Sequence, residues 1–320
     1  MELGDLPVNE SERSHIRSLE GYKDAVASRL PVPCRSIVKR WSIKPIDALA
    51  LVRFLYRYPR EMVVVETGTF LGVSAFNFAS HSKVLEVVSI DSNPSLAELS
   101  QWGYLADPGW PLREFRVLDV AEMALDGFPE QRRKVRLRPG TVESVGVPAS
   151  WDGTSLLAFV DGDHTKEGVA TDLRAIFDKD PAAVAILHDC RHLHGPAILA
   201  GIASFLEDSP TEYCFRLFEP SSPGLRPPNL GVLYPSVTAE EVEQAGPGLL
   251  ASPKSSLIQA AFASWKAWSQ AWQSRDRERE RADREQERAN KQRKRANKHR
   301  KRGDRLEAQL QKARRPWWRK

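Results

Sequence analysis

The most informative segment of this chain is Val63–Ser74, with the sequence VVVETGTFLGVS. Three consecutive valines predict a buried strand, which ends in an acid, Glu66, before a glycine-containing turn. Gly68 and Gly72 would let the backbone turn sharply and approach a ligand closely. A helix is expected to begin directly after Gly72. The segment therefore predicts a ligand site at the carboxyl edge of a parallel α/β sheet.

The same alternation of strand and helix extends from Asp47 to about Tyr234. It predicts a Rossmann-like α/β fold, in which helices cover both faces of a mostly parallel sheet. The last two strands are separated by Pro220–Pro228 and are expected to form an antiparallel hairpin. The seven expected strands are 62–66, 87–90, 135–137, 156–160, 184–187, 214–218 and 231–234. The expected helices lie near 46–57, 73–80, 94–101, 119–132, 166–178 and 195–207.

The spacing of the first turn indicates which cofactor it serves. It is E-x-G-x-x-x-G, whereas a dinucleotide-binding turn has G-x-G-x-x-G and presents a helix N-terminus to a pyrophosphate. A carboxylate at Glu66 suits a cationic ammonium group, directly or through water. The next strand also ends in an acid, Asp91, which can accept both ribose hydroxyls of an adenosine cofactor. The pair predicts an adenosine cofactor, and the first motif favours S-adenosylmethionine.

Further motifs follow in the same order as in a known family. They resemble the ordered motifs of class I S-adenosylmethionine-dependent methyltransferases that act on small molecules. The most similar subgroup carries a D-G-D-H box, and many of its members modify sugars, polysaccharides or secondary metabolites. The resemblance covers about residues 45–235 and implies a seven-stranded sheet whose last strand is antiparallel. The motifs are Glu66-Thr67-Gly68, Ile90-Asp91, Arg138–Glu143, Phe159–His164 and His188-Asp189.

The resemblance also implies a cofactor site. Thr141 would lie near the adenine and Asp161 at the mouth of the site. Two stretches depart from the family pattern: an extra segment near 104–132, and Asp180-Pro181 where a Pro-Gly-Gly turn is usual. The first departure bears mainly on the acceptor pocket. The cofactor-binding residues expected on this basis are Glu66, Gly68, Thr69, Gly72, Ser74, Asp91, Thr141 and Asp161.

Methyl transfer to oxygen needs a general base or a metal ion. His164, His188 and Asp161 are the expected catalytic residues, although His164 also stands at an expected helix start. In metal-dependent relatives a divalent cation such as Mg²⁺ is held by an acid at each of two strand ends, and Asp161 and Asp189 match those positions. Cys190 stands where those relatives have Asp or Asn, and sulfur is a poor ligand for Mg²⁺. The histidine route is therefore favoured.

Charge separates the chain into two parts. Residues 275–320 hold 20 basic and 8 acidic side chains, and the preceding residues hold 27 basic and 34 acidic ones. An acidic body argues against a nucleic-acid-binding core, because nucleic acid is bound by a basic face. The absence of an apolar run of about 18 residues, and of a secretion-signal pattern, predicts a cytoplasmic protein.

The C-terminal segment is expected to be a long helix. An aromatic stripe over 257–272 precedes four seven-residue repeats over 279–306, which are typical of a weak coiled coil. Such a tail would form a homo-oligomer or bind a partner. An anionic membrane surface or acidic glycan is the second interpretation, with peripheral attachment to the membrane, and nucleic acid is unlikely.

The sequence thus predicts four segments: an N-terminal extension (1–45), a methyltransferase domain (46–235), a Ser-, Pro- and Gly-rich linker (236–256) and the helical tail (257–320). The expected function is O-methylation of a sugar, glycan precursor or other small metabolite. Trp102, Trp110 or Trp151 could stack on such an acceptor. Two alternatives stay open: a nicotinamide-dependent oxidoreductase, and a non-catalytic scaffold that works through its tail.

Overall fold

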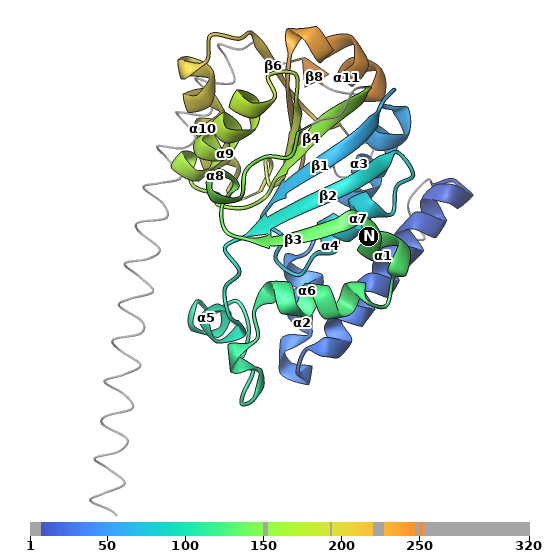
Figure 1. Ribbon diagram of the computed structural model, residues 1–320, viewed down its shortest axis with the longest axis vertical. Helices are drawn as coiled ribbons and strands as arrows, with labels where there is room; N and C mark the ends of the chain where they lie inside the picture. The colour runs from blue at the N-terminus through green and yellow to red at the C-terminus, as the bar shows by residue number, and fades with distance from the viewer. Residues whose placement is uncertain (1–7, 150–152, 193, 220–226, 247–249, 252–320) are drawn as a thin grey trace, which may run out of the picture. The chain divides into compact units, whose positions relative to one another are not determined.

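A computed structural model describes residues 8–149, 153–192, 194–219, 227–246 and 250–251. Its centre is one mixed sheet with the strand order β3-β2-β1-β4-β5-β7-β6-β8 (Figure 1). β3, β2, β1, β4 and β5 are parallel, whereas β7 is antiparallel to both β5 and β6. The strands are β1 (Glu61–Thr67), β2 (Val84–Asp91), β3 (Val135–Pro139), β4 (Thr154–Val160), β5 (Val184–Leu187), β6 (Tyr213–Leu217), β7 (Gly231–Pro235) and the short β8 (Leu250–Ala251).

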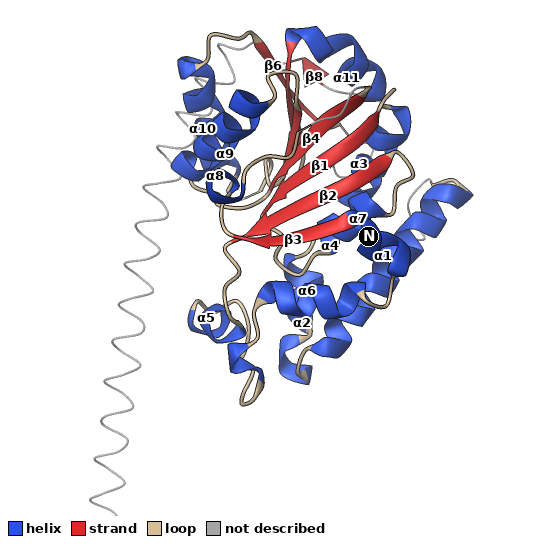
Figure 2. Cartoon of the chain, viewed as in Figure 1, coloured by secondary structure: helices blue, strands red, loops and turns tan. Residues whose placement is uncertain are grey.

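This architecture confirms the predicted fold class and the antiparallel hairpin at its end. Helices cover both faces of the sheet (Figure 2), because the central strands are apolar on both sides. The helices are α1 (Glu10–Arg29), α2 (Ser36–Trp41), α3 (Pro45–Arg57), α4 (Val73–Ala79), α5 (Leu96–Gln101), α6 (Val117–Leu125), α7 (Pro129–Lys134), α8 (Val142–Val145), α9 (Lys166–Lys179), α10 (Gly195–Asp208) and α11 (Ala239–Ala245).

The segment before residue 46 differs from the separate extension that we expected. α1 begins with a capping box between Asn9 and Glu12, and its apolar side is buried in the same core as β1 and β2. Tyr22 is fully buried and stacks on Phe76 of α4, with ring centroids 4.4 Å apart. The N-terminal helix is therefore an integral layer of the domain.

Two other sequence predictions were wrong in detail. The single helix expected over 119–132 is divided into α6 and α7, because Pro129 begins α7 and cannot continue the preceding helix. Part of the expected linker is folded: Ser236–Thr238 forms a 3₁₀ turn and α11 follows it. Val242 of α11 is fully buried, and Glu241 forms an ion pair with Arg60.

The tail expected over 257–320 lies outside the described residues, as does Trp151. The predictions of a long helix, a coiled coil and an aromatic stripe therefore stay predictions. Within the described part of the chain, no helix has the length and apolarity needed to cross a membrane.

Candidate active site

The turn after β1 has the positive backbone angles that its glycines predict: φ is +87° at Gly68 and +74° at Gly72. The neighbouring atoms give a further reason for glycine. A Cβ on Gly68 would lie 2.2 Å from the carbonyl oxygen of Asp161, and one on Gly72 would lie 2.8 Å from the Tyr22 hydroxyl. Both glycines are thus required by contacts within the protein, and their approach to a ligand stays a prediction.

Glu66 lies at the end of β1 and is completely buried. Its Oε2 accepts a hydrogen bond from the Ser89 hydroxyl, and Ser74 also hydrogen-bonds its side chain. Its Oε1 is a buried oxygen without a hydrogen-bond partner among the described residues. Burial raises the pKa of Glu66 to about 8, against the opposing effect of the two serines. The carboxyl group is therefore mostly neutral at pH 7 until a cation lies beside it.

Asp91 lies at the end of β2, next to the same turn. It accepts hydrogen bonds from the backbone N–H of Phe70 (2.7 Å) and of Asn93 (2.6 Å). Burial nevertheless raises its pKa above the usual value. Each carboxylate oxygen keeps lone pairs for a further donor, so both can still accept hydroxyl groups.

The structure assigns Thr69 and Thr141 local structural contacts. The Thr69 hydroxyl is buried and lies 2.7 Å from the Ser89 hydroxyl, so it supports Glu66 indirectly. Thr141 is the N-cap of α8 and accepts a hydrogen bond from the backbone N–H of Ser144. Their expected contacts with a cofactor stay predictions.

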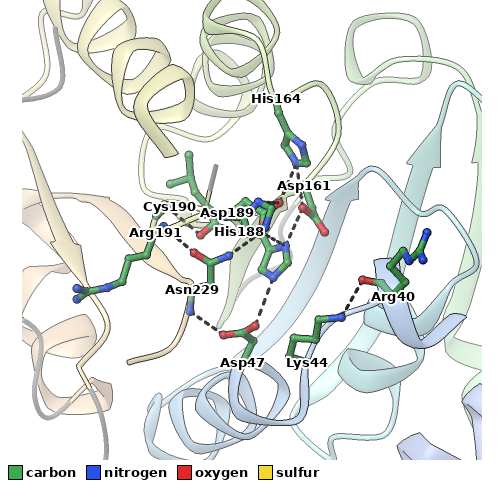
Figure 3. Close-up of polar contacts among 12 residues, drawn as sticks. Arg40, Lys44, Asp47, Asp161, His164, His188, Asp189, Cys190, Arg191 and Asn229 are labelled. Carbon is green, nitrogen blue, oxygen red and sulfur yellow. Dashed lines mark hydrogen bonds and ion pairs between the residues drawn. The ribbon is translucent and has the colours of Figure 1, made fainter. Parts of the chain in front are cut away.

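A second group of polar side chains follows β4 and β5 (Figure 3). Asp161 comes directly after β4, and His188 and Asp189 come directly after β5. Asp161 Oδ1 lies 2.9 Å from His188 Nδ1 and 3.2 Å from His164 Nε2. The structure therefore brings together the three expected catalytic residues and both expected metal ligands, because parallel strands end at one edge of the sheet.

His188 is surrounded by carboxylates. Its Nε2 lies 3.6 Å from Asp47 Oδ2, and its Nδ1 lies 3.6 Å from Asp189 Oδ1 in addition to the Asp161 contact. Burial alone would lower the pKa of His188, but the negative charges around it raise that pKa well above its usual value. His188 is therefore an imidazolium cation at neutral pH and cannot accept a proton there.

Asp161 and His164 respond to the same network. Burial would raise the pKa of Asp161, but the His188 cation and the hydrogen bonds from both histidines hold it well below its usual range. Burial would lower the pKa of His164, but Asp161 and Asp189 raise it overall. The His164 side chain is 27% exposed, against 11% for His188, so His164 is the more accessible of the two imidazoles.

Sequence reasoning missed two members of this network. Asp47 in the first turn of α3 is buried and accepts a hydrogen bond from the backbone N–H of Asn229 (2.6 Å). The Asn229 amide in turn donates to Asp189 Oδ1 at 2.6 Å. An acid on the otherwise apolar start of a helix was the signal for Asp47, whereas nothing in the sequence pointed to Asn229.

Cys190 and Asp189 point in different directions. The Cys190 thiol is buried and donates to the carbonyl oxygen of Leu187, away from the acids. Asp189 has a φ of +56°, a left-handed conformation that is uncommon for residues other than glycine and often marks a functional site. The three groups able to hold a metal ion are Asp161, His164 and Asp189, whose donor atoms all lie within 4.8 Å of one another.

Known proteins were compared with the chain at this point. A family model described as "Methyltransferase domain" matches residues 65–190, which extend from β1 to the end of β5. No curated protein matches the chain. The strand order and the family match together support a class I S-adenosylmethionine-dependent methyltransferase domain.

Several solved structures are also similar to this chain. An O-methyltransferase from Bacillus cereus in complex with SAH is 13% identical, with a TM-score of 0.44 over 72% of this chain and 93% of that chain. TomG from Streptomyces achromogenes, an O-methyltransferase involved in tomaymycin synthesis and solved with SAM, is 14% identical, with a TM-score of 0.41 over 68% and 88%. A putative O-methyltransferase from Klebsiella pneumoniae is 16% identical, with a TM-score of 0.40 over 72% and 92%. Similarities at this level carry no argument about activity.

Proposed function

We propose that this protein is an S-adenosylmethionine-dependent methyltransferase that methylates a hydroxyl group of a sugar, glycan precursor or other small metabolite. The observation that carries the proposal is the buried, unpartnered Oε1 of Glu66 at the end of β1. A buried acceptor without a donor is costly unless a ligand supplies one, and the ammonium group of a methionine-derived cofactor would do so.

Glu66 and Asp91 are the residues that would hold the cofactor, through its ammonium group and its ribose respectively. Ser74 and Ser89 keep the Glu66 carboxyl group in place. When bound, S-adenosylmethionine supplies a methyl group on a positively charged sulfur. The catalytic residues therefore have to act only on the acceptor hydroxyl, by removing its proton.

His164 is the general base in this proposal. Its Nε2 faces Asp161, which orients the ring and stabilises the imidazolium formed when Nδ1 takes the proton. His188 fixes the Asp161 carboxylate from the other side and is itself kept protonated by Asp47, Asp161 and Asp189. Of the two histidines expected to act as base, only His164 suits the role.

A metal-dependent route is the second candidate mechanism, favoured by the convergence of Asp161, His164 and Asp189. Two carboxylates and an imidazole suit Mn²⁺ or another transition metal at least as well as Mg²⁺. An ion there would orient the acceptor hydroxyl and lower its pKa, and His164 would then be a ligand rather than a base.

Neither earlier alternative gains support from the described residues. Nothing favours a nicotinamide cofactor, and the tail that would make the protein a scaffold lies outside those residues. Oligomerisation, partner binding or membrane attachment through the tail stays a proposal, as does the assignment to the subgroup with the D-G-D-H box.

Isothermal titration of the full chain with S-adenosylmethionine tests the proposal. We expect saturable binding that Glu66→Gln and Asp91→Asn weaken by about 10- to 100-fold, the scale of losing a charged hydrogen bond. Glu143→Gln, an exposed acid on α8, is the matched control and should bind as the wild type does. Absence of binding, or equal binding by all four proteins, would contradict the proposal.

A further inference from the structure

Three exposed aromatic rings form a continuous surface on one side of the domain. Trp41 is the last residue of α2, and Trp102 and Tyr104 follow α5. The Tyr104 ring lies edge-on to both neighbours, 4.9 Å from Trp41 and 6.2 Å from Trp102 between centroids. The three residues are 45%, 55% and 40% exposed. Rings gathered in the open in this way usually mark a binding surface, because isolated burial would stabilise them better.

This surface is held in a fixed shape. The Cys34 thiol donates to the carbonyl oxygen of Ala106 at 3.3 Å, which ties the loop after α5 to the N-terminal segment. Leu105 packs against the core between the two exposed residues Tyr104 and Ala106. A preformed surface binds with little loss of conformational entropy.

The aromatic surface is connected to the reaction cluster through α2 and α3. Lys44 Nζ donates to the carbonyl oxygens of Lys39 and Arg40, both at 2.8 Å, so the end of α2 is tied to the start of α3. Asp47, whose carboxylate lies beside His188, is one helical turn beyond Lys44. Figure 3 shows Arg40 and Lys44 on the Asp47–Asp161 side of the cluster, opposite Arg191.

Charge differs sharply between the two areas. Residues 31–46 contain four exposed cations, Arg35, Lys39, Arg40 and Lys44, and no acidic residue. The reaction cluster instead holds three carboxylates against one imidazolium. An anionic group would be repelled from the cluster and attracted to α2, whereas a neutral hydroxyl can enter the cluster. This separation would orient an acceptor that carries both groups.

We propose that this surface is the acceptor-binding site, and that the acceptor is a hydroxylated ring compound with an anionic substituent, a carboxylate or a phosphate. The ring stacks on Trp41 and Tyr104, the anionic group pairs with Arg40, and the hydroxyl faces His164. This inference rests on the proposed methyltransferase function, and it narrows the acceptor to anionic ring compounds.

Matched pairs of probes test the inference on the full chain with S-adenosylmethionine present. D-glucuronate is compared with D-glucose, and 4-hydroxybenzoate with 4-hydroxybenzyl alcohol, by ligand-observed NMR titration. In at least one pair the anionic probe should bind about 10-fold more tightly than the neutral one, as expected for one charged pair. Arg40→Ala should remove that preference, and Trp41→Ala should weaken both members about 10-fold. Arg133→Ala on α7 and Tyr56→Ala at the far end of α3 are exposed controls and should change neither value.

Titration with S-adenosylmethionine separates the two levels of the proposal. If no protein binds it, the proposed function fails. If all variants bind it equally but neither anionic probe is preferred, or the preference persists in Arg40→Ala, the acceptor inference alone is wrong. Vesicles of about 3:1 phosphatidylcholine to phosphatidylserine address the remaining explanation. Vesicle binding that Trp41→Ala abolishes, without any preference among the probes, would make this surface a membrane contact and overturn the inference.

Discussion

The two ends of the candidate site treat buried acids in opposite ways. Beside β1 and β2, Glu66 has only hydroxyl partners, and burial raises its pKa to about 8. Beside β4 and β5, Asp161 is equally enclosed, yet its pKa is held well below the usual range by His188 and His164. One end lacks a cation and the other contains its own. The difference indicates that the first end is built to receive a positively charged ligand and the second to hold a charged catalytic group.

The largest expected effect concerns catalysis at the β4–β5 end. Once an accepted substrate is found, His164→Gln should lower kcat by about 10²- to 10⁴-fold, the usual contribution of a general base. The cofactor dissociation constant should not change, and His192→Gln is the control because His192 is a half-exposed loop histidine nearby. A rate that EDTA abolishes and Mn²⁺ or Mg²⁺ restores would instead establish the metal route.

Removing one negative charge at each end should have opposite consequences for stability. Asp47→Asn leaves the His188 cation short of a partner, so the free energy of unfolding at pH 7 should fall by about 2–3 kcal/mol. Glu66→Gln replaces a group that is mostly neutral at that pH and should not destabilise the protein. Urea unfolding measures both, with Asp24→Asn on the exposed side of α1 as the control. Equal losses for Asp47→Asn and Glu66→Gln would refute the comparison between the two ends.

The smallest expected effect is a proton count. Because the folded pKa of Glu66 lies above its unfolded value, its stabilising contribution is present at low pH and is lost as the pH rises through about 8. A ligand ammonium group beside Glu66 would lower that pKa again. Binding of S-adenosylmethionine at pH 7 should therefore release close to one proton, seen as a dependence of the titration enthalpy on the buffer. Glu66→Gln should release none, and unchanged proton release in this variant would show that another group titrates.

Local patterns were sufficient for the sheet and for the residues at its carboxyl edge. The expected strand 184–187 coincides with β5, and the others differ by one to three residues at their ends. Runs of β-branched residues carry this information directly, and parallel strands bring Asp161, His188 and Asp189 to one edge without further knowledge. This is why a single sequence could predict the members of the cluster.

Long-range packing was much harder to predict. α1 has a mixed sequence whose buried side includes His15 and Lys23, so its burial follows from its neighbours and not from its hydropathy. Asn229 lies more than 180 residues from Asp47, and only the folded chain shows their hydrogen bond. The protonation state of His188 likewise depends on three acids from separate segments. Such features depend on tertiary contacts that residue spacing does not report.

The contact between Gly68 and Asp161 has a consequence for how such a protein can evolve. The backbone N–H of Asp161 donates to the carbonyl oxygen of Thr67 at 2.9 Å, and Gly68 has no room for a side chain against Asp161. A substitution in one loop would therefore displace the other, and the two loops must change together or not at all. New acceptor preferences can arise more freely in α2 and in the loop after α5, which lie outside this shared backbone contact. Variation among descendants of this chain should accordingly concentrate there.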